Sequence, residues 1–158
     1  MLDLLADNFD LVAPVNEFSP RQVPGVITDA PWKLASGINI IIGHSGSGKT
    51  RIFEAMKRPL KELDTASVKR AAPTNLSQGQ KVFFALETLL QIQPQGSCLM
   101  IDDVGNLDRL HMKLWCHQLK RHNKQVIIAM SSIAWELWGE MFNDLPVKLF
   151  HLELPPRG

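Results

Sequence analysis

The sequence predicts an α/β fold in which a sheet of mainly parallel strands is flanked by helices. Short apolar runs alternate with longer stretches whose apolar residues recur at helical spacing. The runs are continuous, which is typical of parallel strands covered on both faces. They comprise Ile38–Ile42, Cys98–Ile101 and Val126–Met130. Ligands of such folds bind at the carboxyl ends of the strands, so the residues that follow each run are the first candidates for function.

Length and composition indicate one ordinary globular domain. The chain has 158 residues, 45% hydrophobic and 21% charged, so we expect a single domain over residues 1–158. The formal net charge of +1 gives no overall bias towards nucleic acid. No apolar run approaches the roughly 20 residues that cross a bilayer, and the start lacks the basic region of a signal peptide. We therefore expect a cytoplasmic protein with no membrane partner.

The flanking elements follow from local patterns. Residues 1–35 are expected to form a small β-rich portion, with a short helix over 2–9 and strands over 25–28 and 32–35. The helix after Thr50 should end before Pro59, because proline cannot continue a helix. Residues 57–75 should be a short connection with one short strand over 67–71. A last strand over 147–154 alternates as a half-exposed strand does.

Three further helices are predicted from apolar spacing. One runs from the stretch 76–80 to residue 92, where Pro94 and Gly96 end it. A second buries Leu107, Leu110, Leu114, Trp115 and Leu119, and a third starts at 131–132 and buries two tryptophans, Trp135 and Trp138. Cys98 and Cys116 lie in apolar surroundings and are expected to be buried.

A glycine-rich loop joins the first buried strand to the following helix. It has the pattern G-x-x-x-x-G-K-[ST], in which glycines let successive backbone N–H groups converge on a phosphate at a helix N-terminus. Lysine in this pattern reaches the β- and γ-phosphates and the hydroxyl ligates Mg²⁺. The predicted ligands of ATP and Mg²⁺ are Gly43, His44, Ser45, Gly46, Ser47, Gly48, Lys49 and Thr50.

Two carboxylates follow the second buried strand. Because parallel strands end at one edge of the sheet, Asp102 is placed to reach the same Mg²⁺ as Thr50, directly or through water. Asp103 is then placed to orient or deprotonate an attacking water, and we predict Asp103 and Lys49 as catalytic residues. A carboxylate in this position can otherwise serve only as a helix cap.

The stretch Leu76–Gln80 stands just before a predicted helix and about 20 residues ahead of Asp102. It resembles the LSGGQ signature of ABC-type ATPases, with Gln78 in place of the first glycine. That resemblance implies an ATP-dependent homodimer in which Ser77, Gln78, Gly79 and Gln80 close over a nucleotide held by a second subunit. In isolation, the same stretch would indicate only a helix N-cap at Ser77.

Further matches extend this resemblance over well over half of the chain, from about residue 32 to residue 132. The stretch 105–108 is similar to the family's D-loop, which implies that Asp108 bridges two subunits. The stretches 37–43, 53–56 and 76–81 are more similar to the ATPase heads of SMC, RecF and related DNA-repair proteins than to transporter subunits. This branch implies a P-loop NTPase sheet and a role with DNA or a DNA-bound protein.

Four departures from the family favour a slow ATPase whose main output is nucleotide-dependent association. Only residues 51–76 separate the phosphate loop from the signature, so no coiled-coil arm is present. That interval contains no glutamine for a Q-loop. Asp103 stands where the family usually has glutamate, and a misplacement of order 1 Å can cost about a hundredfold in rate. Ser131 stands where transporters carry a switch histidine.

Other interpretations remain open. The chain is alternatively an ATP-gated regulatory module that binds a protein and has vestigial hydrolysis, while the signature stretch disfavours a small-molecule kinase. Phe18 and Trp32 are candidates for stacking on adenine. The spacing of His111, His117 and His122 matches no common zinc pattern.

Overall fold

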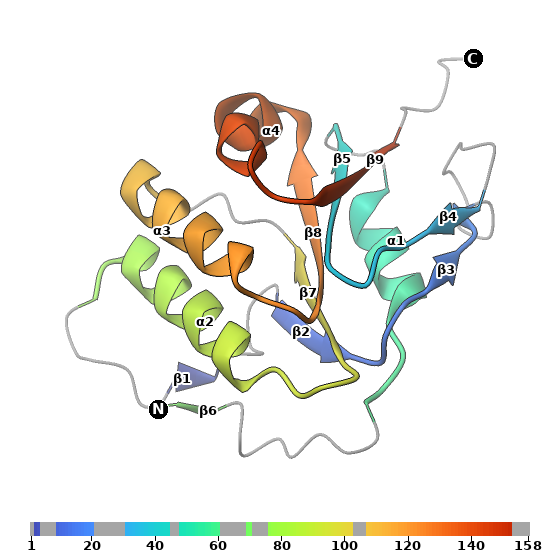
Figure 1. The fold of residues 1–158 in the computed structure, drawn as a ribbon, viewed down its shortest axis with the longest axis horizontal. Coiled ribbons are helices and arrows are strands. Elements are labelled where there is room, and N and C mark those ends of the chain that lie inside the picture. Colours follow the sequence, from blue (N-terminus) through green and yellow to red (C-terminus); the bar gives the residue numbers. More distant parts are fainter. Residues whose placement is uncertain are drawn as a thin grey trace.

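The computed structural model describes residues 2–3, 9–20, 31–44, 48–60, 69–70, 76–102 and 107–152. In this part of the chain the main element is a five-stranded sheet with the order β2-β7-β8-β5-β9 (Figure 1). Strands β7, β8, β5 and β9 run parallel, and β2 pairs antiparallel with β7 at one edge. The strands are β2 (Phe9–Val12), β5 (Ile38–Gly43), β7 (Cys98–Asp102), β8 (Gln125–Ser131) and β9 (Val147–Leu152). The expected α/β fold with a mostly parallel sheet is confirmed.

Both faces of the sheet are covered, which explains why the central strands are apolar along their whole length. Ile40, Leu99 and Ile128 belong to one apolar cluster, and their neighbours Ile41, Met100 and Ile127 belong to the other. This alternation follows from the two-residue period of a strand. All six residues of β5 are buried.

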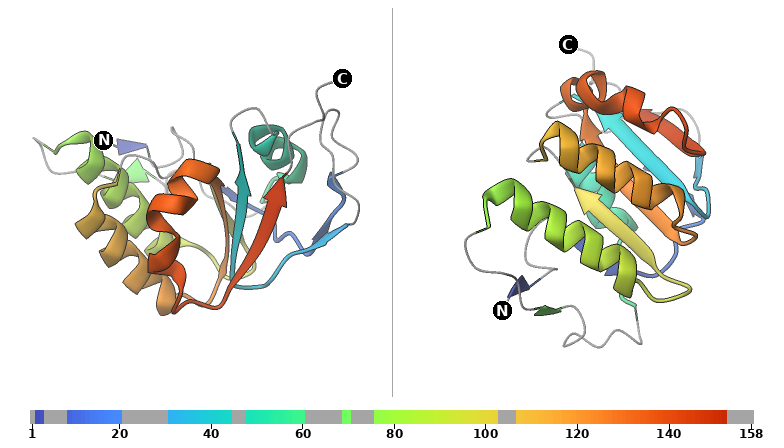
Figure 2. Two further views of the ribbon diagram at one scale, coloured as in Figure 1. Left: turned by 90° about the horizontal axis from the view of Figure 1, so that it is seen from above. Right: turned by 60° about the vertical axis from the view of Figure 1, so that its left-hand side comes forward.

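The helices divide between the two faces. Figure 2 shows α1 (Lys49–Met56) on one side of the sheet and α2 (Gln78–Ile92), α3 (Arg109–Lys120) and α4 (Ser132–Trp138) on the other. A single 3₁₀ turn, η3 (Gly139–Phe142), follows α4 directly. Helix α1 buries Ile52, Phe53 and Met56, and it ends before Pro59 as predicted.

Short strands complete the described structure. β1 (Leu2–Asp3) pairs with β6 (Lys69–Arg70), and β3 (Glu17–Phe18) pairs with β4 (Trp32–Lys33). The strand expected within 67–71 is therefore confirmed. The strand expected over 25–28 and residues 153–154 of the last strand lie outside the described residues.

The short helix expected over residues 2–9 is wrong at both of its ends. Residues 2–3 form β1, and Phe9 begins β2, the edge strand of the main sheet. Within the N-terminal portion, β2 completes the main sheet, with Phe9 opposite Ile101. A partner 92 positions away overrides local preference here.

The buried face of α3 also differs from the prediction. Leu110 and Leu114 were expected in the core but are 63% and 44% exposed. The helix instead buries Met112, Trp115, Cys116 and Leu119. Two apolar stripes compete on this helix, and packing against α2 and the sheet selects the second.

Two buried side-chain amides form hydrogen bonds near the amino-terminal ends of the parallel strands. Gln125 donates to the carbonyls of Val15 and Ala35, at 2.7 and 2.9 Å, and accepts from the N–H of Val15 at 2.9 Å. Asn39 accepts from the N–H of Ala35 at 2.7 Å and donates to its carbonyl at 2.9 Å. These bonds tie β8 and β5 to the segment that precedes β5.

No helix among the described residues is both long enough and apolar enough to span a membrane.

Candidate functional site

Two predicted Mg²⁺ ligands meet at the carboxyl edge of the sheet. Thr50 lies in the first turn of α1, after β5, and Asp102 is the last residue of β7. The Thr50 hydroxyl donates a hydrogen bond of 3.1 Å to Oδ2 of Asp102. Strand β8 lies between β5 and β7, so Thr50 and Asp102 meet because the three parallel strands end at the same edge of the sheet. The two residues are far apart in the sequence.

The loop between β5 and α1 reaches the helix through Gly48. This residue has φ of +99°, a left-handed conformation that glycine adopts without a steric penalty. Its carbonyl accepts the first helical hydrogen bond, from Ile52, at 2.9 Å. The N-terminus of α1 therefore opens directly onto the loop, where the helix dipole favours an anion.

Lys49 lies over this loop. Its ammonium donates to the carbonyl oxygens of Gly43 and His44, at 2.6 and 3.0 Å. The positive charge is thus held between the end of β5 and the start of α1. Ser45, Gly46 and Ser47, three further predicted phosphate ligands, lie outside the described residues.

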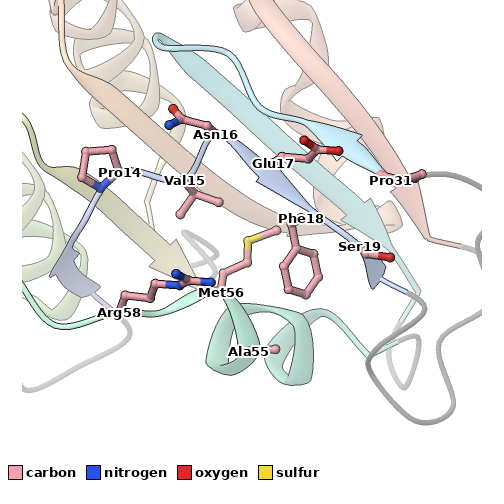
Figure 3. A pocket seen from close by; sticks show the side chains of 10 residues that line it. All are labelled: Pro14, Val15, Asn16, Glu17, Phe18, Ser19, Pro31, Ala55, Met56 and Arg58. Atoms are coloured by element: carbon pink, nitrogen blue, oxygen red, sulfur yellow. The ribbon is translucent and has the colours of Figure 1, made fainter.

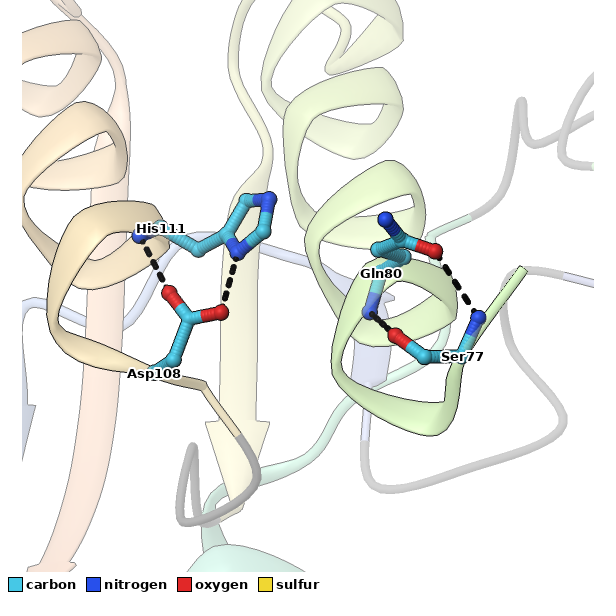
Figure 4. Close-up of polar contacts among 4 residues, drawn as sticks. All are labelled: Ser77, Gln80, Asp108 and His111. Atoms are coloured by element: carbon cyan, nitrogen blue, oxygen red, sulfur yellow. Dashed lines mark hydrogen bonds and ion pairs between the residues drawn. The ribbon is translucent and has the colours of Figure 1, made fainter.

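Ser77 caps the first turn of α2 (Figure 4). Its hydroxyl accepts from the N–H of Gln80 at 3.2 Å, and Oε1 of Gln80 accepts from the N–H of Ser77 at 2.9 Å. This reciprocal pair is a capping box, for which S-x-x-Q is the sequence pattern. Both side chains are exposed, and the side chain of Gln78 and the exposure of Gly79 are outside the described set.

Asp108 caps α3 in the same way, beside Ser77 in Figure 4. Its carboxylate accepts from the N–H of His111 and contacts Nδ1 of the same residue, both at 2.8 Å. Both interactions lower the pKa of the Asp108 carboxyl, and the hydrogen bond from the backbone N–H of His111 contributes most. The ring of His111 packs on Phe83 with centroids 4.9 Å apart, which ties the start of α3 to α2.

Four of the predicted groups therefore lie towards one edge of the sheet. α2 precedes β7 and α3 follows it, so in this alternating arrangement both helices begin near the carboxyl ends of the strands. Within the described residues, the hydrogen bonds of Ser77 and Asp108 run to their own helices and none joins them to Thr50 or Asp102. Asp103, the predicted water-orienting residue, is outside the described part of the chain.

The two candidate aromatic residues have different environments. Trp32 is buried and packs against Phe150, with ring centroids 4.9 Å apart. Phe18 lines a cavity of about 490 Å³ between β3 and the last turn of α1, together with Val15 and Met56 (Figure 3). Phe18 is therefore the one of the two whose ring is accessible to a ligand.

His122 and the two cysteines lie in largely buried surroundings, whereas His117 is exposed. Nε2 of His122 is 2.7 Å from Oε1 of Gln93, and burial lowers the pKa of this histidine. Burial raises the pKa of both thiols, Cys98 and Cys116, to about 12. Among the described residues, no group of three or more His, Cys, Asp or Glu side chains is placed to hold a metal ion.

Comparisons with protein-family models, with curated proteins and with solved structures return no match for this chain.

Proposed function

We propose that this chain binds ATP with Mg²⁺ at the Gly43–Thr50 loop and hydrolyses it slowly, as a compact ABC-type ATPase of the SMC/RecF-like branch. The observation that carries this proposal is the 3.1 Å hydrogen bond between Thr50 and Asp102. It places a hydroxyl and a carboxylate, both hard oxygen donors, beside a glycine-rich loop at a helix N-terminus.

The distance between the two oxygens suits a magnesium ion. Mg²⁺ takes octahedral ligands at about 2.1 Å, so neighbouring ligands lie about 3 Å apart. Thr50 and Asp102 have this separation already, at 3.1 Å. When bound, Mg²⁺ would neutralise charge on the phosphate oxygens, and these two side chains would hold it. A site of this kind needs few protein ligands, because Mg²⁺ keeps several waters and binds phosphate.

The other residues of the loop act on the nucleotide. Lys49 supplies a positive charge next to the phosphates, and the N-terminus of α1 supplies oriented N–H groups. Phe18 is the candidate for contact with the base. Asp103 would hold the attacking water, and its side chain, one methylene shorter than glutamate, makes slow turnover the expectation.

ATP is proposed to hold two copies together in a role that involves DNA or a DNA-bound protein. Ser77 and Asp108 are exposed at the same edge as Lys49, and their hydrogen bonds run within their own helices. In the proposed dimer, Ser77 would meet the nucleotide of the second copy, and Asp108 would bridge to the second subunit itself. Their capping bonds also favour the second candidate, an ATP-gated binding module with vestigial hydrolysis. Phosphate release distinguishes the two functions, because only an ATPase turns over.

The experiment is sedimentation velocity with ATP, with ADP and without nucleotide, alongside a phosphate-release assay. We expect ATP alone to increase association, and slow phosphate release with Mg²⁺. Lys49→Ala should lose both, because the loop loses its positive charge. Lys33→Ala, which removes an exposed lysine on β4, is the matched control and should retain both. Equal sedimentation in all three states would contradict the ATP-dependent association.

A further inference from the structure

A groove of about 620 Å³ runs between α3 and η3. Its apolar lining includes Leu110 and Leu114 from α3 and Met141 and Leu145 from the η3 side. We propose that this groove is a self-association surface, through which two copies of the chain pair around a two-fold axis without nucleotide.

The first observation is the exposure of two leucines on one stripe of α3. Leu110 and Leu114 are 63% and 44% exposed, and their spacing of four residues places them one above the other on the helix. The opposite stripe of α3 is fully used in the core, so these leucines are not needed for packing within the chain. Exposed apolar side chains that line a groove with charged borders are typical of protein contact sites.

The second observation is the division of charge across the groove. Arg109, Lys113 and Lys120 line its α3 side, whereas Glu140 and Asp144 line its η3 side. In the part of the chain that the structure describes, no ion pair joins these five side chains to one another or to a third residue. Each wall therefore presents charge that a partner of opposite sign can match.

A second copy supplies that match. In a two-fold contact each patch meets the same patch of the partner, so the basic wall of each copy can face the acidic wall of the other. The leucine stripes then meet near the axis, where water is excluded. Nucleic acid does not suit this groove, because Glu140 and Asp144 would repel its phosphates. A partner protein that presents only an acidic helix does not suit it either, because the acidic η3 side would have no opposite charge to pair with.

This contact uses different side chains from the ATP-dependent one, although the groove begins at Arg109, directly after Asp108. A chain with two different two-fold interfaces forms assemblies larger than a dimer when both are occupied. We therefore expect the wild-type protein to be a dimer without nucleotide and larger with ATP. Lys49→Ala should remain a dimer in both states, so the failure of either proposal can be recognised separately.

The test is sedimentation velocity of the nucleotide-free protein at about 100 μM, well above a micromolar Kd. We expect wild type to dimerise and Leu114→Glu to weaken association by roughly tenfold or more, because a buried charge replaces a central apolar contact. Leu149→Glu, at a leucine on β9 with a similar exposed fraction of 41%, is the matched control and should associate as wild type does. Thermal unfolding of both variants checks the fold.

A charge exchange tests the pairing of the walls. Lys113→Glu alone should weaken association, because like charges then face each other, and Lys113→Glu with Glu140→Lys should restore it. Added salt should weaken the wild-type dimer by screening these pairs. A monomeric wild-type protein at this concentration, or undiminished association of Leu114→Glu, would overturn the proposal. The proposal would also be overturned if Lys113→Glu with Glu140→Lys failed to restore association.

Discussion

Ser77 illustrates how one side chain can serve the fold and the proposed function. Its hydroxyl accepts the N–H of Gln80 and closes the first turn of α2. The same hydroxyl is exposed at the edge of the sheet where Lys49, Thr50 and Asp102 lie. A capped helix start carries the positive end of the helix dipole, so in the proposed dimer it would present a prepared surface to the phosphate of a second copy.

Substitution of Ser77 can separate these two roles. Ser77→Ala should lower the free energy of unfolding by about 1 kcal/mol through loss of the cap and should also reduce ATP-dependent association. Ser77→Asp should keep the cap, because aspartate caps helices as well as serine does, yet place a negative charge against phosphate. Urea unfolding and sedimentation with ATP measure the two effects. Association of Ser77→Asp equal to wild type would exclude Ser77 from the contact.

At the scale of elements, β8 determines where the candidate Mg²⁺ ligands lie. It separates β5 from β7, and its start is fixed by Gln125, whose amide bonds both Val15 and Ala35. These bonds set the segment before β5 against β8 at the far edge of the sheet. We infer that the strand ends, and thus the distance from Thr50 to Asp102, depend on this buried amide.

Gln125→Leu tests the structural part of that inference. The change removes a buried amide and leaves the N–H and the carbonyl oxygen of Val15 without their partner, whereas the carbonyl of Ala35 keeps its bond from Asn39. We therefore expect a loss of about 2–4 kcal/mol of unfolding free energy. Gln91→Leu replaces an exposed glutamine on α2 and should change stability by less than about 0.5 kcal/mol. Equal urea midpoints for the two variants would show that the amide contributes nothing specific.

Elements that are marked by a local sequence pattern were predicted correctly. The buried strands β5, β7 and β8 appear as unbroken apolar runs, and proline and glycine mark the end of α2. β2 escaped prediction because its partner, β7, lies about 90 positions along the chain. The exposure of Leu110 and Leu114 also escaped prediction, because α3 has two apolar stripes and only tertiary packing chooses between them.

At the scale of the whole molecule, part of the candidate site was readable in the sequence. The approach of Thr50 to Asp102 follows from the loop motif and from the rule that parallel strands end at one edge. The cap at Ser77 corresponds to the structural alternative that its motif allows, whereas the cap at Asp108 was not predicted. The groove beside α3 was not foreseen, because its walls come from segments that meet only after folding.

The molecule therefore presents two surfaces with different chemistry. The carboxyl edge of the sheet gathers a glycine-rich loop, a lysine and two oxygen donors, as an anion with a metal ion requires. The groove between α3 and η3 is apolar with charged borders, as a protein partner requires.

The magnesium dependence of nucleotide affinity tests the pairing of Thr50 with Asp102 most directly. Calorimetric titration with a non-hydrolysable ATP analogue should show that Mg²⁺ tightens binding to wild type by roughly tenfold or more, since the ion links the phosphates to both side chains. Asp102→Asn should bind the analogue with little gain from Mg²⁺, whereas Glu136→Gln, at an exposed carboxylate on α4, should keep the full gain. An equal gain in wild type and Asp102→Asn would contradict the proposed site.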